Sequence, residues 1–430
     1  MPAHAAGPLE TNVLDNAILG SIRAAANDME AAYRAFHQMP ELSMQETRTS
    51  AAIVQRLEGM GLSPQRFGGT GVVAVIENGT GPVVAYRADI DALPIKEATG
   101  LDYASSARGI LPDGSETHVM HGCGHDMHIT VGLYLAHVLV HNRASWAGTV
   151  IMIFQPGEET GQGAQAMLED GLWATVTRPE AIYAQHDWPG PVGHLFIKPG
   201  TAMAMSDSLK VTVHGRQAHG AQPEDGIDPI VLGAYMIVRL QSVVSREIAG
   251  TDMAVITIGT FHGGLKENII PDRAEFKVNI RSFDEGVREK VLAAVRRIIL
   301  AEAVASGAPE PDIESMYSFP RCHNDPQLAE NLIARLGSEF GPDKVHLDKA
   351  HTGSEDFGRF GDQIGVPYVY WHFGVYSPGK FTQADQPAGI HSPFFASDDV
   401  PATLHTGVRA ALTAVLGHVG KPSQAMGKPS

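Results

Sequence analysis

The sequence of 430 residues has little of several things that would define other classes of protein. It contains only two cysteines, Cys123 and Cys322, which argues against a disulfide framework. It has no run of about 18 apolar residues, the length that a membrane-spanning helix needs. Its first 14 residues lack the basic start and apolar core of an export signal. We therefore expect a cytoplasmic protein with reduced thiols and no membrane partner.

Positive charge is also scarce. The chain has 32 Lys and Arg against 48 Asp and Glu, a formal net charge of -16, and no basic cluster. Because binding to nucleic acid depends on neutralising phosphates with Lys and Arg, the composition argues against a nucleic-acid partner. The 43% of hydrophobic residues and the chain length are typical of a soluble globular protein with about two domains.

The spacing of apolar residues predicts an α/β protein. Helices are expected over 15–37, 46–60, 129–141, 328–340 and 400–419, and strands over 71–76, 83–86, 149–154, 181–185 and 367–371. The strand 149–154 is apolar throughout, which is typical of a sheet covered by helices on both faces. Three strands run into polar residues: Asp89, the pair Glu158 and Glu159, and His186. Ligands of open α/β sheets bind at the carboxyl ends of strands, so these residues indicate one shared site.

The middle of the chain has a different pattern. Residues 206–317 have the order β-α-β-β-α-β, which is the split βαβ arrangement of ferredoxin-like domains. We expect an inserted α+β domain over 201–318 that can close over the site as a lid. The remaining residues, 1–200 and 319–430, form one discontinuous domain with a helix-covered mixed sheet.

The stretch Met120–His128 reads Met-His-Gly-Cys-Gly-His-Asp-Met-His and concentrates potential metal ligands. Cys123 and His125 are the strongest candidates. If the segment is extended, they point to the same side, and the glycines let the backbone approach an ion. The alternative is a catalytic cysteine nucleophile, which needs one basic histidine rather than a surplus of histidines and carboxylates.

Two further groups fit a metal-assisted hydrolysis. Glu158 and Glu159 follow a buried strand and point opposite ways if extended, so one can bind metal while the other moves a proton. Asp89 or Asp91 can hydrogen-bond a ligand histidine and fix its orientation, and we expect Asp89 in this role. His186, His391 and His219 would not stand out by themselves.

The motifs together resemble a known family. Eight stretches carry the resemblance, in matching order and spacing: Phe36–Ser43, Arg87–Pro94, Met120–His128, Gln155–Glu159, Ala218–His219, Asn268–Pro271, Gly353–Phe357 and His391–Pro393. The chain is similar to the amidohydrolases of the dinuclear-metal aminoacylase and carboxypeptidase superfamily. Within it, the closest branch holds hippurate hydrolases, indole-acetyl-amino-acid hydrolases and N-acyl-amino-acid hydrolases.

The resemblance implies a role for each matching residue. Two divalent ions (Mn, Zn, Co or Ni) would be held by Cys123, His125, Glu159, His186 and His391, with Cys123 bridging. Glu158 would be the general base and later the general acid. His219 would steady the oxyanion in a neighbouring subunit's site, across a homodimer or homotetramer formed through the inserted domain. Asn268 and Arg281 match positions that bind the substrate's carboxylate.

The expected activity is metal-dependent hydrolysis of the amide bond of a small N-acyl amino acid. One alternative is a metallo-exopeptidase that acts on dipeptides, and another is acyl transfer to an amine. A third is a non-catalytic binding protein with the same fold, against which the retention of Glu158 and all five candidate ligands argues.

Overall fold

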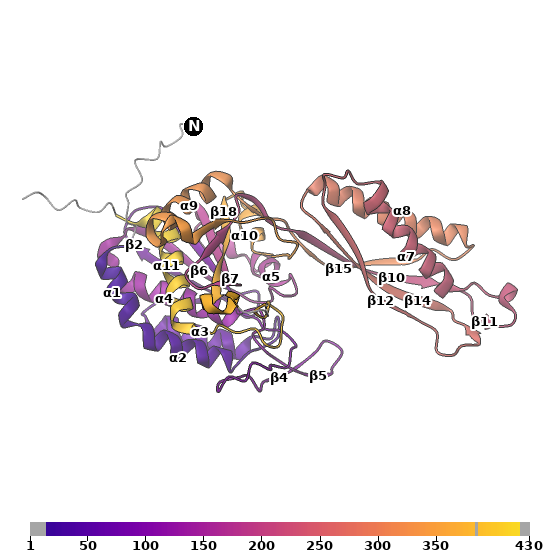
Figure 1. Ribbon diagram of the computed structural model, residues 1–430, viewed down its shortest axis with the longest axis horizontal. Coiled ribbons are helices and arrows are strands. Elements are labelled where there is room, and N and C mark those ends of the chain that lie inside the picture. The colour runs from indigo at the N-terminus through magenta and orange to yellow at the C-terminus, as the bar shows by residue number, and fades with distance from the viewer. Residues whose placement is uncertain (1–13, 383–385, 422–430) are drawn as a thin grey trace, which may run out of the picture. The chain divides into compact units, whose positions relative to one another are not determined.

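The computed structural model describes residues 14–382 and 386–421, which form two compact units (Figure 1). The first unit comprises 1–202, 323–349 and 356–430, and the inserted unit comprises 203–322 and 350–355. The start of the chain, in which we expected no export signal, and the tail after residue 421 lie outside the described residues. The segment 350–355 belongs to the inserted unit, although sequence patterning gave no reason to place it there.

The first unit is built on a mixed sheet of eight strands in the order β1-β2-β6-β3-β7-β18-β8-β17. Neighbouring strands from β6 to β18 run parallel, while β2 is antiparallel to both β1 and β6, and β8 is antiparallel to β18. The strands are β1 (Gln65–Phe67), β2 (Gly71–Asn78), β3 (Val83–Asp89), β6 (Gly148–Gln155), β7 (Ala181–Pro191), β8 (Leu195–Ile197), β17 (Val345–Leu347) and β18 (Tyr368–Tyr376).

Helices cover this sheet. The longer helices are α1 (Asn16–Ala24), α2 (Ala26–His37), α3 (Thr47–Gly59), α4 (His125–His141), α9 (Pro326–Phe340) and α11 (Val400–Val419). The helices α4 and α11 pack against each other and against β3 (Figure 1). Alternate residues Val84, Tyr86 and Ala88 of β3 join the same apolar core, so Arg87 and Asp89 face the other way. The mixed, helix-covered sheet confirms the predicted fold class.

The single helix expected over 15–37 is two helices. The N–H of Ala25 reaches back to Ser21 and Arg23, which turns the chain between α1 and α2. Both helices contact α4, so the turn keeps both against one neighbour. The remaining short elements are β4 (Arg108–Ile110), β5 (Glu116–His118), α5 (Gly163–Glu169), α6 (Leu172–Thr175), β9 (Gly200–Met203), β16 (Cys322–Asn324), α10 (Gly358–Asp362) and the 3₁₀ turns Arg143–Ser145, Pro223–Asp225, Pro342–Lys344 and Pro378–Thr382.

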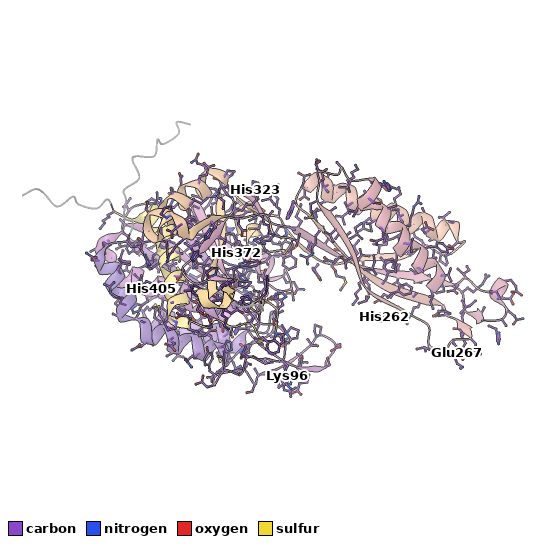
Figure 2. The ribbon with its side chains drawn as sticks, viewed as in Figure 1. Lys96, His262, Glu267, His323, His372 and His405 are labelled. Carbon is purple, nitrogen blue, oxygen red and sulfur yellow. The ribbon has the colours of Figure 1, made fainter. Side chains whose placement is uncertain are left out.

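The inserted unit has the predicted order of elements: β10 (Met205–His214), α7 (Pro229–Arg246), β12 (Ala254–Gly263), β14 (Arg273–Ser282), α8 (Glu285–Ala305) and β15 (Asp312–Phe319). The four strands are antiparallel in the order β12-β14-β10-β15, and α7 and α8 pack on the sheet over one apolar core. Two short strands, β11 (Ala218–His219) and β13 (Ile269–Ile270), form a separate ribbon. Figure 2 labels His262 on β12 and Glu267 on the loop that leads to β13. No helix among the described residues is both long and apolar enough to cross a membrane.

Candidate functional site

The site begins at the turn that precedes α4. Gly124 has φ 76°, and a Cβ there would lie 1.9 Å from Asp187 Oδ2, so only glycine fits. The segment is therefore a tight turn and not the extended stretch that side-chain alternation would require. Cys123 lies before the turn and His125 opens the helix, and both side chains are buried. Cys123 Sγ lies 3.3 Å from His186 Nε2.

The loop after β6 adds the carboxylates. Glu159 Oε1 lies 3.9 Å from His125 Nε2. Ligand atoms of Cys123, His125 and Glu159 all lie within 4.8 Å of one another. Glu158 is buried beside this group, 6% exposed. Glu159 is thus among the candidate ligands.

His186 and His391 complete the set from distant parts of the chain. The predicted strand ended before His186, but β7 continues to Pro191. It stays paired with β18, which places His372 opposite His186. The Nδ1 of His186 contacts the backbone oxygen of Asp187 at 2.6 Å, which leaves Nε2 facing Cys123.

His391 has an unusual backbone. Its φ of 65° is in the left-handed region, which costs a non-glycine residue about 1–3 kcal/mol and is found mostly at functional sites. Its N–H donates to the carbonyl of Gly122 at 2.7 Å, and its Nε2 lies 3.3 Å from Glu159 Oε1. The five candidate ligands are therefore brought together in one place.

The chemistry of this cluster fits a bound cation. His125 Nε2 and Glu159 Oε1 are buried and have no hydrogen-bond partner among the described residues. Buried polar atoms are normally satisfied, and a metal ion would satisfy both. Burial, and next the nearby carboxylates Glu159 and Glu158, raise the pKa of the Cys123 thiol well above its usual value. A positive ion would reverse that effect, because metal binding deprotonates a coordinating thiol.

We expected Asp89 to accept a hydrogen bond from a ligand histidine, but Asp91 accepts the one from His125. Asp91 Oδ1 lies 3.1 Å from His125 Nδ1, and Asp91 Oδ2 accepts from the backbone N–H of Glu159 at 3.1 Å. Burial opposes ionisation of Asp91, but the hydrogen bonds from His125 and Ser43 outweigh it and lower the pKa. The ionised Asp91 can thus hold His125 with Nε2 free for an ion.

Asp89 supports the site one layer further out. It accepts from Arg87 and contacts His128 Nδ1, while His128 Nε2 accepts from the backbone N–H of Asp187 at 2.8 Å. Both ring nitrogens of His128 therefore have hydrogen-bond partners, although His128 lies close to the candidate ligands His125 and His186. In the sequence, Asp89 was favoured over Asp91 only because it lies at the end of a strand. The position of a strand end does not show which of the two carboxylates contacts His125.

The inserted unit carries the other three predicted residues. His219 is exposed on β11, and Gly220 beside it donates to the carbonyl of Asn268, so His219 and Asn268 lie on one ribbon. Arg281 lies near the far end of β14, a strand of ten residues and so about 30 Å long. It donates to the carbonyl of Thr352 at 2.6 Å and to Asn279 Oδ1 at 3.0 Å. Asn268 and Arg281 therefore do not share one binding position within this unit.

The fold and the cluster define the class of protein. An α/β sheet that gathers a cysteine, histidines and paired carboxylates near its strand ends has the organisation of a metal-dependent hydrolase. Comparison with known proteins gives the family. The signature of peptidase family M20/M25/M40 matches residues 85–415, so the chain belongs to this family and is a hydrolytic enzyme that acts on amide bonds.

Three relatives illustrate the range of the family. An N-acetyl-L-cysteine deacetylase of Bacillus subtilis is 41% identical over 390 residues, which cover 86% of this chain and 87% of that protein. A thermostable carboxypeptidase of Saccharolobus solfataricus is 34% identical over 353 residues, with 81% and 86% covered. The crystal structure of a dinuclear metal-binding peptidase of the M20 family from Bacillus subtilis has a TM-score of 0.71 and 30% identity, with 91% and 98% covered.

Proposed function

We propose that the protein hydrolyses the amide bond of N-acyl amino acids with two divalent metal ions. The observation that carries the proposal is the buried group of Cys123, His125 and Glu159, in which His125 Nε2 and Glu159 Oε1 have no hydrogen-bond partner among the described residues. The deacetylase relative supports the substrate class, and the dinuclear metal-binding structure supports the number of ions.

The proposed ligands are Cys123, His125, Glu159, His186 and His391. Bound divalent ions would polarise the amide carbonyl and lower the pKa of water. A set of sulfur, nitrogen and oxygen ligands suits Mn, Zn, Co or Ni. The position of Cys123, 3.3 Å from His186 and within 4.8 Å of His125 and Glu159, suits a bridging thiolate.

Glu158 is the proposed general base. Its carboxylate takes a proton from the attacking water and later gives that proton to the departing amine, so that a carboxylic acid and a free amino acid are released. Burial of Glu158 next to Glu159 keeps bulk water from competing for this proton. Asp91 keeps His125 and the backbone of Glu159 in place during the reaction.

The inserted unit is proposed to contribute to catalysis when two or more copies of the protein associate. Its ribbon presents His219 and Asn268 on an exposed surface, which suits contact with the site of a second copy in a homodimer or homotetramer. His219 would donate a hydrogen bond to the oxyanion, and Asn268 or Arg281 would bind the substrate's carboxylate.

Replacing His219 by alanine should lower kcat by about 10²–10³-fold, the usual effect of removing one oxyanion donor, with unchanged metal content. Steady-state kinetics and elemental analysis of the same sample test this. His262→Ala is the matched control, because His262 is an exposed histidine at the end of β12 and should be silent. A His219→Ala enzyme with the wild-type kcat would remove His219 from the mechanism.

The rival function is that of an exopeptidase, which the carboxypeptidase relative favours. Both reactions cleave the same kind of bond, and they differ in whether the substrate carries an acyl group or a free α-amine. Acyl transfer would need an amine to replace water, and a non-catalytic protein would show no turnover at all.

A substrate screen separates these functions. The purified protein with measured metal content is given acetyl, benzoyl, indole-acetyl and long-chain N-acyl amino acids, together with dipeptides that have free amino termini. Release of free amino acid from the acylated compounds, with kcat/KM well above that for the dipeptides, supports the proposal. Preference for the dipeptides would establish the exopeptidase, and no turnover with any compound would contradict both.

A further inference from the structure

A short segment before α3, residues 43–46, contacts the loop that carries the two catalytic-site glutamates. Ser43 Oγ donates to Asp91 Oδ2 at 2.6 Å, the same oxygen that accepts from the N–H of Glu159. Ser43 thereby holds the carboxylate that orients both His125 and Glu159. This is the first of two connections between the segment and the loop.

The second connection is made by Glu46, whose side chain is fully buried. Its Oε1 accepts from the backbone N–H of Gly157 at 2.8 Å and from that of Met44 at 2.7 Å. Its Oε2 accepts from Thr70 Oγ1 at 2.6 Å. One carboxylate therefore joins three separate pieces of chain.

Glu46 occupies the N-cap position of α3 but makes no capping hydrogen bond with its side chain. Residues at this position commonly accept from the N–H groups of the first helical turn. Here Thr49 N instead donates to Glu41 Oε2. The carboxylate of Glu46 thus serves the loop 157–159 and not the helix that it begins.

Other hydrogen bonds hold the loop further along, where the N–H groups of Gln162 and Gly163 donate to the carbonyl of Gly157, and Glu46 holds its start. Pro156 has no N–H, so Gly157 carries the first backbone donor after β6 ends at Gln155. Gly157 has φ 54°, a backbone conformation that favours glycine, and a Cβ on it would lie 2.5 Å from Met44 Sδ. This N–H belongs to the peptide between Pro156 and Gly157, so Glu46 fixes the chain one residue before Glu158.

We propose that Glu46 is a positioning residue that orients Glu158 by holding the backbone N–H of Gly157. The inference rests on the proposed function, since Glu158 is the general base only there. A misplacement of about 1 Å at a reacting group can cost 10²-fold in rate, so a remote carboxylate can control turnover without touching the substrate.

Two substitutions at Glu46 separate positioning from charge. Glu46→Leu removes the acceptor, whereas Glu46→Gln keeps one acceptor oxygen for Gly157 and can donate its amide to Thr70 Oγ1. Glu41→Leu is the matched control. Glu41 also accepts from backbone and side-chain donors in the same region, at Thr49 and Arg48, without a contact to the loop.

Each variant is assayed for kcat, KM and metal content, and for deuterium uptake of the peptide that contains Gly157. Glu46→Leu should lower kcat roughly 10- to 100-fold with KM and metal content unchanged, and should speed exchange at Gly157. Glu46→Gln should recover most of kcat, and Glu41→Leu should stay within about twofold of wild type.

Wild-type kcat in Glu46→Leu, or an equal loss in Glu46→Leu and Glu46→Gln, overturns the proposal. If the wild type hydrolyses no N-acyl amino acid, the proposed function fails. The role of Glu46 is then tested by deuterium exchange alone: unchanged exchange at Gly157 in Glu46→Leu would show that Glu46 does not hold this N–H. If Glu46→Leu does not fold, Thr70→Val replaces it: a several-fold lower kcat supports the proposal, and a wild-type kcat overturns it.

Discussion

Glu158→Gln should reduce kcat by about 10²–10⁴-fold while the protein keeps its metal ions. The substitution preserves the size of the side chain and its place beside the cluster, but the amide cannot accept the proton of the attacking water. Because Glu158 is proposed as a base and not as a ligand, the loss should be confined to the chemical step. Stopped-flow or steady-state kinetics with elemental analysis of the same sample measures both quantities.

The adjacent residue provides the control. Glu159→Gln should lose metal as well as activity, because Glu159 is a proposed ligand whose Oε1 faces His125 Nε2 at 3.9 Å. The two isosteric variants, one position apart, should therefore differ in metal content and resemble each other in poor turnover. Fast hydrolysis by Glu158→Gln would take the base role away from Glu158.

Removal of the metal ions should abolish hydrolysis and also destabilise the fold. The buried atoms His125 Nε2 and Glu159 Oε1 lose the ion that is proposed to satisfy them. A ligand at 100 times its Kd stabilises the native state by about 2.7 kcal/mol, so the melting temperature should fall on chelation. Added Mn or Zn should restore both activity and Tm.

The thermal measurement makes this prediction independent of the substrate. The Glu158→Gln variant, which is inactive but should bind metal, must show the same fall in Tm on chelation as the wild type. The Glu159→Gln variant should show a smaller fall in Tm on chelation, because it binds less metal. Full activity in a sample proven free of metal would contradict the proposal that hydrolysis depends on metal ions.

The fold could largely be predicted because the spacing of apolar residues differs between helices and strands. The helix α11 has the predicted bounds, 400–419, and the strand β14 (Arg273–Ser282) is one of the strands expected within 206–317. In both, alternation or helical periodicity is regular to the last residue. The expected helix over 15–37 failed only at Ala25, where a local turn keeps both halves against α4 and leaves no trace in the periodicity.

The candidate ligands were also accessible from sequence, but their supporting contacts were not. Cys123 and His125 stand out by composition, whereas the choice between Asp89 and Asp91 depends on which carboxylate meets His125 in space. Glu46 gave no signal, because a single glutamate at the start of a predicted helix is normally an exposed residue. Its burial against Gly157 arises from a contact across 111 positions of chain.

The passage of the chain between the two units has a consequence for dissection of the protein. The inserted unit includes 350–355 as well as 203–322, and Arg281 of β14 donates to the carbonyl of Thr352 within it. A shortened protein made by splicing residue 202 to 323 would keep 350–355 but lose the strand against which that segment rests. Directly after it, Asp356 accepts from Gln155 Nε2 at 2.6 Å and from the N–H of Ala164 at 3.1 Å. The inserted unit therefore cannot be removed by deleting one continuous segment. A minimal catalytic fragment needs a second deletion, of 350–355, that ends before Asp356.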